Sequence, residues 1–559
     1  MDTTFLQPPP PPPGDMAFIS HSGAICAAVI DWVRGQGTGF SHLISLGNQA
    51  DVNETDVLEP VAEDPHTKVL TMYLEGISNG RRFMETARRV TRQKPVIALK
   101  VGRFEAGKRA AASHTGALAG QEAAFDAAFQ KAGVLRANTS EEMFYWARAL
   151  AWCPLPQGRR IAILTNAGGP GVTASDALEL NQLKLADLSP ETDAALKAIL
   201  PPAASTHNPV DMLASAPPEH YAQCLQALLA DEGVDGVIVI SPPPPASSAG
   251  AVTKAILPII QMSDKPVILA LMGDQLIQEG VAFARAAQVV EYRFPEWAAS
   301  AMGALARYAD WRQMPEDETL VFDDVQKEAA AKLLVGQPAG EFLPQEVANG
   351  LLAAYGIPTV QPQLAESADE AVALAEKMGY PVVLKVASPD ISHKSDVGGV
   401  LLNLRDADAV REGYEAITER ARLARPTARL EGAHVQRMLP PGQEVIVGVV
   451  SDPQFGPMVM FGSGGVEVEG LKDVTFALAP LSQREAEEML AATWAGRKLN
   501  GFRSLPAADR EAVMAILARL AQLALDFPQI AEIEINPVRA LPGKGGAFAI
   551  DVRARLASG

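Results

Sequence analysis

The side chain best suited to carry a chemical group is His114, which is surrounded by small residues. It lies in the stretch AAASHTGALAG at residues 110–120, where Ala, Ser, Thr and Gly leave the backbone open to an anionic partner. The helical spacing of apolar residues after this stretch predicts a helix that ends at Gly133. We therefore expect His114 in a small-residue loop before a helix. The alternative is an ordinary loop histidine without a chemical role.

Two other segments combine a buried strand, a glycine-bearing turn and a helix, an arrangement that binds anions. The strand MAFIS leads through the turn 20–23 into a helix over residues 24–34. The strand RRIAILT leads through the glycine-rich turn 166–171 into a helix over residues 172–180. Unpaired N–H groups and the positive end of the helix dipole converge at such a start. Ordinary helix capping by Ser22 is the alternative at the first segment.

Strands and helices alternate around these segments, which predicts parallel sheets with helices on both faces. The repeated plan of strand, turn and helix predicts two flavodoxin-like parallel-sheet domains, at residues 16–152 and 158–312. Glu75 closes the strand LTMYLE, at the edge where parallel sheets bind ligands. It is therefore a candidate partner that fixes the tautomer of His114. A plain surface carboxylate is the competing interpretation of Glu75.

The third region of the chain, residues 341–557, carries a lysine suited to nucleotide phosphates. Lys385 lies in the predicted strand PVVLKVAS and is followed by a glycine-bearing loop that contains His393. A lysine on a strand acts as a point charge, and such a loop can close over phosphates. The pattern lacks the sequence of a P-loop. Further along, we expect the strand AHVQRML to form a hairpin with QEVIVGVV, which opens with Glu444.

Oxygen ligands for a metal ion cluster near the end of the sequence. In AEIEINP, strand alternation places Glu532, Glu534 and Asn536 on one face and two isoleucines toward the core. Asp551 in the next strand, AFAIDV, can meet that face across a hairpin. Hard oxygen ligands of this kind suit a Mg²⁺ ion that bridges nucleotide phosphates. A solvated polar face is the alternative.

Composition restricts the class of protein. The 559 residues carry a formal net charge of −18, which opposes binding to nucleic acid and to anionic lipid. The three cysteines, Cys26, Cys153 and Cys224, show no metal-binding spacing and cannot all pair, which favours a reducing cytosol. No apolar run reaches 18 residues and no signal peptide is recognisable, so we expect a cytoplasmic protein without a membrane span.

Two segments are expected to connect domains rather than to form them. Residues 1–15 contain a run of prolines, which is stiff and extended and predicts a tail. Residues 313–340 are acidic and rich in alanine, and we interpret them as a hinge before the third region.

Taken together, these motifs resemble those of a known family. The chain is similar to the NDP-forming acyl-CoA synthetases, the group of ADP-forming acetate-CoA ligases related to succinyl-CoA synthetase. The resemblance rests on five motifs that occur in the family's order: SHSGA at 20–24, SHTGALAG at 113–120, TNAGGPG at 165–171, HKSDVGGV at 393–400 and EIEINP at 532–537. It implies two succinyl-CoA synthetase-like flavodoxin domains followed by an ATP-grasp domain.

The resemblance also implies roles for individual residues. His114 would take the phosphoryl group, Glu75 would stabilise it, and His393 would relay phosphate near the nucleotide. The residues implied to hold phosphate are Ser22, Gly23, Asn166, Gly168 and Gly169. Those implied to contact ATP are Lys385, Gln436, Leu439 and Glu444, and those implied to hold Mg²⁺ are Glu534, Asn536 and Asp551.

The implied reaction is that of an acid-thiol ligase: a small carboxylic acid, CoA and ATP give acyl-CoA, ADP and phosphate through acyl phosphate and phosphohistidine. Family members that are fused begin with a CoA-binding domain, whereas about fifteen residues precede the first strand in this chain. Three explanations are open: a separate CoA-binding subunit binds CoA, the sequence is an incomplete version of the protein, or the activity is altered. We also expect that the chain works in a homo- or hetero-oligomer.

Two other functions remain open from the sequence. The first is a non-catalytic sensor of ATP or acyl-CoA, similar to regulatory relatives that are fused to protein acetyltransferases. The second is an ATP-grasp carboxylate–amine ligase, which explains Lys385 and Asn536 but leaves His114 and both glycine-rich helix starts without a role.

Overall fold

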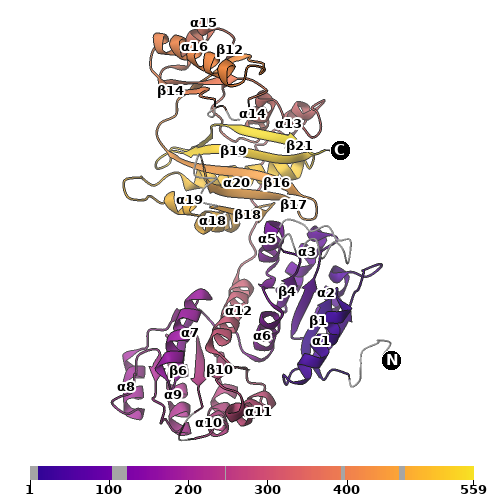
Figure 1. The fold of residues 1–559 in the computed structure, drawn as a ribbon, viewed down its shortest axis with the longest axis vertical. Helices are drawn as coiled ribbons and strands as arrows, with labels where there is room; N and C mark the ends of the chain where they lie inside the picture. Colours follow the sequence, from indigo (N-terminus) through magenta and orange to yellow (C-terminus); the bar gives the residue numbers. More distant parts are fainter. Residues whose placement is uncertain are drawn as a thin grey trace. The chain divides into compact units, whose positions relative to one another are not determined.

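The computed structural model describes residues 10–103, 122–243, 245, 247–391, 394, 397–464 and 473–558. The chain forms two compact units, Met1–Pro315 and Glu316–Gly559 (Figure 1). His114 and His393, both singled out above, lie outside the described residues. Within the described part of the chain, no helix is both long enough and apolar enough to cross a lipid bilayer.

The first unit begins with a parallel sheet of five strands in the order β2-β1-β3-β4-β5. Its central strands β1, β3 and β4 are short apolar runs that are largely buried on both faces, as parallel sheets require, whereas the edge strand β2 is mostly half-buried. They are β1 (Pro13–Ser20), β2 (Phe40–Ser45), β3 (Val69–Leu74), β4 (Val96–Lys100) and β5 (Leu135–Ala137). The helices are α1 (Gly23–Arg34), α2 (Glu54–Glu63), α3 (Gly80–Thr91), α5 (Glu122–Ala132) and α6 (Ser140–Trp152). The carboxyl ends of β1, β2 and β3 thus lie side by side at one edge.

A second parallel sheet follows in the same unit, with the strand order β11-β10-β9-β6-β7 and with β8 paired to β6. The strands are β6 (Arg160–Thr165), β7 (Lys184–Leu185), β8 (Val210–Asp211), β9 (Gly236–Ser241), β10 (Val267–Leu271) and β11 (Glu291–Tyr292). The helices are α7 (Gly168–Leu180), α8 (Pro190–Ile199), α9 (Pro218–Ala230), α10 (Ala249–Gln261), α11 (Gln278–Ala286) and α12 (Pro295–Gln313), with a short 3-10 helix at Gln275–Ile277.

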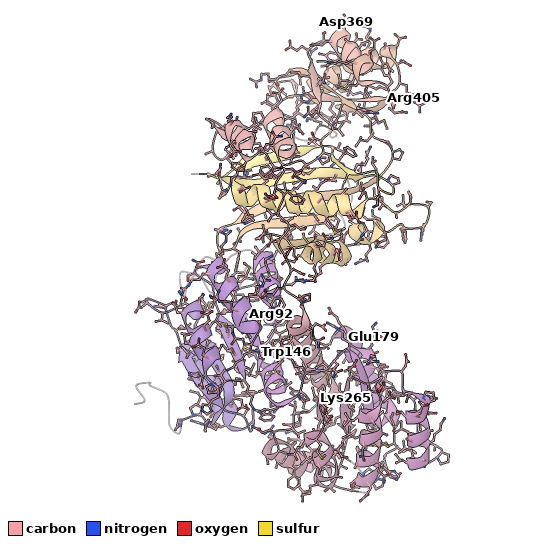
Figure 2. The ribbon with its side chains drawn as sticks, turned by 180° about the vertical axis from the view of Figure 1, so that it is seen from behind. Arg92, Trp146, Glu179, Lys265, Asp369 and Arg405 are labelled. Carbon is pink, nitrogen blue, oxygen red and sulfur yellow. The ribbon has the colours of Figure 1, made fainter. Side chains whose placement is uncertain are left out.

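One hydrophobic core joins the two sheets of the first unit. It contains residues of α1 and α6 from the first sheet and of α7 and α12 from the second. Two residues from the part of the chain that forms the first sheet and its helices, both labelled in Figure 2, form hydrogen bonds to α12 and to the residue that follows it. Trp146 donates a hydrogen bond to Ser300 Oγ at 2.9 Å, and Arg92 donates to the carbonyls of Trp311 and Met314. The two sheets therefore share their packing and are not independent of each other.

The second unit contains two antiparallel sheets. The smaller sheet has the order β12-β15-β13-β14 and is formed by β12 (Gln363–Ala365), β13 (Val382–Ala387), β14 (Val400–Leu404) and β15 (Gly432–Arg437). Helices α15 (Ala368–Met378) and α16 (Ala407–Ala424) pack against each other and against this sheet, and together they enclose a small core of their own (Figure 1).

The larger sheet has the order β18-β17-β16-β19-β20, with β21 paired to β19. Its strands are β16 (Gln443–Asp452), β17 (Gly456–Ser463), β18 (Val474–Leu478), β19 (Ile530–Ala540), β20 (Ala547–Ala549) and β21 (Val552–Leu556). The helices around it are α13 (Lys327–Leu334), α14 (Gln345–Ala354), α18 (Gln483–Ala492), α19 (Trp494–Lys498) and α20 (Arg510–Asp526). The alternation predicted for β19 is observed, since Ile533 and Ile535 are buried and Glu534 is exposed.

Three local predictions differ from the structure. The expected hairpin between AHVQRML and QEVIVGVV is wrong, because β15 pairs with β12 and β13 whereas β16 pairs with β17 and β19. The glycine-rich turn 166–171 is largely helical, because α7 already starts at Gly168. The range 313–340, which the sequence suggested as a hinge, contains α13, whose Ala330 and Leu334 belong to the large core of the second unit.

Candidate active site

Two helix starts and one strand end in the first unit are the candidate places for phosphate binding. Helix α1 follows β1 through Ser22, whose Oγ accepts a hydrogen bond from the N–H of Ile25 at 3.4 Å. Ser22 therefore does cap the helix, as the alternative interpretation held. Gly23 is the first residue of the helix and lies partly exposed. Glu75 directly follows β3, the strand beside β1, so the expected placement at the strand edge is observed.

The start of α7 lacks the cap that most helix starts possess. Its first residues are Gly168 and Gly169, and the preceding Ala167 offers no side-chain hydrogen bond. Asn166 is 3% exposed, and its Oδ1 has no hydrogen-bond partner among the described residues. A buried polar atom without a partner is costly, and free N–H groups at a helix start attract an anion. Together these features fit a phosphate that carries a protonated oxygen.

The sequence prediction gave no role to Asp211, which borders this second helix start. Its Oδ2 lies 3.4 Å from the point where a Cβ on Gly168 would stand, and its Oδ1 accepts from the N–H of Leu213. The available signal was its position at the end of the short strand β8, which pairs with β6. Open space surrounds the Cβ position of Gly169 instead, with no heavy atom within 4 Å.

In the second unit, Lys385 lies where the smaller sheet meets the larger one. Its Nζ donates to the carbonyl of Ile550 at 3.4 Å, and Ile550 immediately precedes Asp551. Burial lowers the pKa of the Lys385 ammonium, the charge of Asp551 opposes that shift, and the nearby cations Lys394 and Arg539 add to it. A half-buried lysine with two further cations nearby is stabilised by an anionic ligand, and polyphosphate is such a ligand.

The structure brings a further residue to this place that the sequence prediction did not name. His434 lies on β15 directly opposite Lys385 on β13. Burial lowers the pKa of His434 to about 4, and the positive charges of Lys394 and Lys385 contribute to the shift. The histidine is therefore neutral at physiological pH. Its signal in the sequence was its position two residues before Gln436, which places both side chains on one face of the strand.

The other residues implied to contact ATP occupy different settings. Gln436 is buried and donates hydrogen bonds to the carbonyls of Val360 and Ile550, so its amide nitrogen fastens the two sheets together. Glu444 accepts a hydrogen bond from Arg539 at 2.6 Å. Leu439 lies half-buried in the connection between β15 and β16.

Two of the three residues implied to hold Mg²⁺ lie next to each other. The N–H of Asn536 donates to the carbonyl of Asp551 at 3.1 Å, and Oδ1 of Asp551 accepts from Gln345. Glu534 is exposed on the same strand as Asn536, opposite Gly448 and Arg553. In the described part of the chain, no group of three His, Cys, Asp or Glu side chains is arranged to hold a metal ion. The oxygen donors present suit a cation whose remaining ligands come from phosphate.

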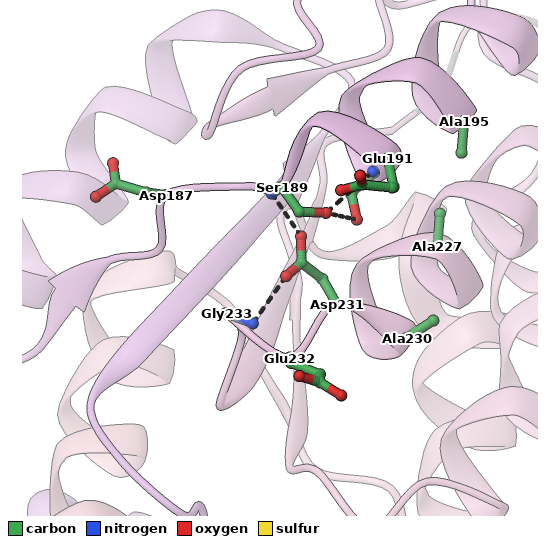
Figure 3. A pocket seen from close by; sticks show the side chains of 10 residues that line it. Asp187, Ser189, Glu191, Ala195, Ala227, Ala230, Asp231, Glu232 and Gly233 are labelled. Carbon is green, nitrogen blue, oxygen red and sulfur yellow. Dashed lines mark hydrogen bonds between the residues drawn. The ribbon is translucent and has the colours of Figure 1, made fainter.

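A cavity of about 560 Å³ beside α8 and α9 includes none of the predicted site residues (Figure 3). Four acidic residues line it: Asp187, Glu191, Asp231 and Glu232. Figure 3 shows that Asp231 already accepts hydrogen bonds from the N–H groups of Ser189 and Gly233, at 2.8 Å each. The negative charge of these four side chains disfavours phosphate, so the cavity is a poorer candidate phosphate site than the two helix starts.

Three domain families match the chain in succession. The succinyl-CoA ligase like flavodoxin domain matches residues 13–150, the ligase-CoA domain matches residues 161–314, and the ATP-grasp domain matches residues 337–556. These families correspond to the two parallel sheets and to the two-sheet second unit. The expected fold class, two flavodoxin-like domains followed by an ATP-grasp domain, is thereby confirmed.

The chain is similar to named relatives over nearly its whole length. It is 40% identical to acetate-CoA ligase (ADP-forming) I of Archaeoglobus fulgidus over 549 residues, which are 97% of this chain and 77% of that protein. Acetate-CoA ligase (ADP-forming) II of Pyrococcus furiosus consists of separate subunits. Its subunit alpha is 43% identical over 53% of this chain and 65% of its own length, and its subunit beta is 42% identical over 37% and 88%.

A solved structure agrees with this assignment. The dinucleotide forming acetyl-coenzyme A synthetase 1 of Ca. Korarchaeum cryptofilum, in complex with phosphate and ADP, is 38% identical with a TM-score of 0.52. The match covers 54% of this chain and 66% of that one. These relatives are named as ligases or synthetases, so the alternative of a non-catalytic sensor has no support. The chain belongs to the family of ADP-forming acyl-CoA synthetases, which are ligases related to succinyl-CoA ligase.

Proposed function

We propose that the chain catalyses the formation of acyl-CoA from a small carboxylic acid, CoA and ATP, with release of ADP and phosphate. The observation that carries this proposal is the start of α7, where a buried amide oxygen without a partner among the described residues adjoins a helix start without a cap. A phosphate or acyl phosphate is the ligand whose charge and hydrogen bonds fit that place. The A. fulgidus relative, named as an ADP-forming acetate-CoA ligase, supports the same reaction.

The chemical logic explains why a phosphohistidine is useful. A carboxylate does not transfer its acyl group directly, because oxide is a poor leaving group, whereas phosphate is a good one. We assign the phosphoryl group to His114, with Glu75 holding the imidazole and stabilising its positive charge. The phosphoryl group passes from ATP to His114, from His114 to the acid, and leaves as phosphate when the CoA thiol attacks the acyl phosphate. The protein contributes positioning and charge neutralisation.

The remaining roles follow from the places of the side chains. Ser22 and Gly23 at α1, with Asn166, Gly168 and Gly169 at α7, would hold the phosphate on the acid side. Lys385 would neutralise the polyphosphate of the nucleotide. We further assign Leu439, Glu444 and Gln436 to the neighbourhood of the nucleotide, and His393 to a second, subordinate phosphate relay.

Magnesium would be held by Asn536 and Asp551, with Glu534 as a further oxygen donor. The pair is pre-assembled by the backbone hydrogen bond between the two residues, and the charge of Asp551 lies close enough to oppose the lowering of the Lys385 pKa by burial. The ion supplies charge neutralisation between phosphate oxygens when it is bound. The chain's own residues hold and orient these oxygens next to the lysine.

CoA binding and assembly form the last part of the proposal. The chain spans 77% of the A. fulgidus relative, and the P. furiosus enzyme is divided into two subunits. We propose that the protein works as an oligomer and that a CoA-binding domain or subunit completes it. Its place of action would be the cytoplasm, where acids, CoA and ATP are available.

The test is a product analysis with acetate as the acid, Mg²⁺, ATP and CoA. The chain is assayed alone and with the CoA-binding domain of a fused relative added. We expect acyl-CoA, ADP and phosphate in equal amounts. Release of AMP and pyrophosphate, or ATP hydrolysis that does not depend on acid and CoA in both preparations, would contradict the proposed reaction.

A further inference from the structure

A second histidine, His21, lies in the motif SHSGA at residues 20–24, and its side chain is buried. Its side chain is buried at the carboxyl end of β1, one residue before the cap of α1. Its Nδ1 accepts a hydrogen bond from the N–H of Glu75 at 3.2 Å. Its Nε2 lies 3.6 Å from Oε2 of Glu54 and in contact with the side-chain amide of Gln49.

These contacts fix the tautomer of the ring. A nitrogen that accepts a hydrogen bond carries no proton, so the proton of neutral His21 sits on Nε2 and faces Oε2 of Glu54. The side-chain amide of Gln49 contacts the same nitrogen, and with this tautomer the amide oxygen is the atom that accepts. Because both nitrogens are engaged and the residue is 8% exposed, His21 is not available to accept a phosphoryl group. The motif SHSG therefore contains a histidine with a different task from that of His114.

Two residues that contact His21, Glu54 and Gln49, are themselves fixed by the surrounding structure. Glu54 is completely buried and is the first residue of α2, where the positive end of the helix dipole stabilises its charge. Apart from the contact with His21, its Oε2 has no hydrogen-bond partner among the described residues. Gln49 adopts a left-handed backbone conformation with a φ of 54°, although it is not a glycine. Strain of this kind persists where the surrounding structure requires it, and it is common at functional sites.

His21 thus connects the loops that follow three neighbouring strands. It belongs to the end of β1, contacts Gln49 and Glu54 after β2, and binds the backbone of Glu75 after β3. The N–H of His21 also donates to the carbonyl of Tyr73 at 3.1 Å, which fastens the same strand end a second time. One hydrogen-bonding atom of the Glu75 carboxylate is left unused, since Oε2 is buried and has no partner among the described residues.

We propose that His21 is a positioning residue that fixes the backbone of Glu75 and thereby aims its carboxylate at the phosphorylated histidine. The inference rests on the proposed function, since it assumes that Glu75 stabilises His114. It predicts an effect on one half of the reaction only. Transfer between His114 and the acid takes place where Glu75 acts, whereas transfer from ATP depends on Lys385 in the second unit.

Two variants separate the hydrogen bond to Glu75 from the rest of the ring. In His21→Asn, Oδ1 takes the place of Nδ1 and can still accept from the N–H of Glu75. In His21→Gln, the side chain can reach toward Glu54 but offers no acceptor at the position of Nδ1. Both variants remove the same ring from the core, so their stabilities should be similar, which a thermal denaturation experiment checks.

The experiment measures the two half-reactions separately in the full chain. Wild-type protein is phosphorylated with labelled ATP and Mg²⁺, and return of the label to ADP reports the nucleotide side. Loss of label to acetate, as acetyl phosphate trapped with hydroxylamine, reports the acid side. We expect His21→Gln to slow the acid side by about 10-fold to 100-fold, the usual consequence of misplacing a reacting group, with the nucleotide side unchanged. His21→Asn should retain most of the wild-type rate on both sides.

Three results would overturn the inference: equal loss of both half-reactions in His21→Gln, no loss in either, or equal defects in His21→Gln and His21→Asn. A wild-type protein that takes up no label from ATP would instead refute the proposed function, so the two failures are distinguishable. Label found on His21 itself would contradict the inference that both of its ring nitrogens are engaged.

Discussion

Lys385 is the residue on which nucleotide binding should depend most strongly. Its half-buried ammonium lies near Asp551 and near the cations Lys394 and Arg539, and its pKa is lowered by burial, so bound phosphate would stabilise its charge. We predict that Lys385→Met lowers kcat/KM for ATP by about 100-fold or more, because a preorganised charge at the phosphates is lost. Phosphoenzyme formation at varied ATP concentration measures this. Lys377→Met, an exposed lysine on α15, is the matched control and should behave as wild type.

The burial of His434 predicts that the stability of the protein depends on pH. Its pKa is lowered by burial to about 4, below its ordinary value of 6.5, so the unfolded chain binds the proton more readily than the folded one. The stability that neutral His434 contributes is therefore present above about pH 6.5 and is lost as the pH falls toward 4. NMR titration of the 8 histidines, with His434→Gln for assignment, should show one resonance that titrates near 4. A value near 6.5 for His434 would show that the site is open to water.

The sequence predicted where several proposed site residues lie in the fold, because their positions follow from strand geometry alone. Glu75 had to lie at a strand end, and the alternation in EIEINP had to place Asn536 beside the polar face. The contacts of His21 and His434 could not be predicted in this way. Both depend on which strands become neighbours, which the pattern of a single strand does not contain.

A substitution at the start of α7 can distinguish a phosphate-binding role of this helix start from a purely structural role. A Cβ at Gly169 meets no heavy atom within 4 Å, so Gly169→Ala should fold and should stabilise the helix by up to about 1 kcal/mol. If phosphate binds the N–H groups there, the added methyl group should weaken phosphate-dependent acyl transfer by about tenfold. Steady-state kinetics at varied phosphate, in the direction from acyl-CoA, measures this.

A change further along the same helix serves as the control. Val172 is 64% exposed, and Val172→Ala should raise helix stability without approaching the helix start. Unchanged kinetics in both variants would contradict the assignment of phosphate to this helix start.

Elements were predictable where the apolar pattern was regular. Buried runs such as those of β1 and β6 identified parallel strands, and the structure differs by only a few residues, since β1 begins at Pro13 and not at Met16. The predicted hairpin of β15 with β16 failed because alternation identifies a strand but not its partner. The acidic, alanine-rich composition around α13 also suits a short amphipathic helix, and the structure contains one, whose Ala330 is fully buried.

For the whole molecule, a buried ion-pair cluster links the two sheets of the first unit. Glu291 on β11 is 2% exposed and pairs with Arg285 and with Arg148 of α6. We predict that Glu291→Gln destabilises the first unit by about 3–5 kcal/mol, because two arginines lose their buried counter-charge. Urea denaturation should show the transition of the first unit shifted and that of the second unit unchanged.

An exposed pair in the same unit is the control. Asp310 and Arg159 are both partly open to water, so Asp310→Asn should cost less than about 1 kcal/mol. Similar losses in both variants would show that the cluster at Glu291 is not the connection between the sheets. A shift of both transitions in Glu291→Gln would show that the units do not unfold separately.

The phosphohistidine on which the whole reaction depends can be tested by mapping acid-labile phosphate. The protein is incubated with Mg²⁺ and labelled ATP, quenched in base, and the modified residue is identified by mass spectrometry in wild type and in His114→Asn. We predict phosphate on His114 in the wild type, no phosphate at that position in the variant, and its return to ATP when ADP is added. Equal labelling of wild type and His114→Asn, or nucleotide binding without any phosphohistidine, would contradict the proposed reaction.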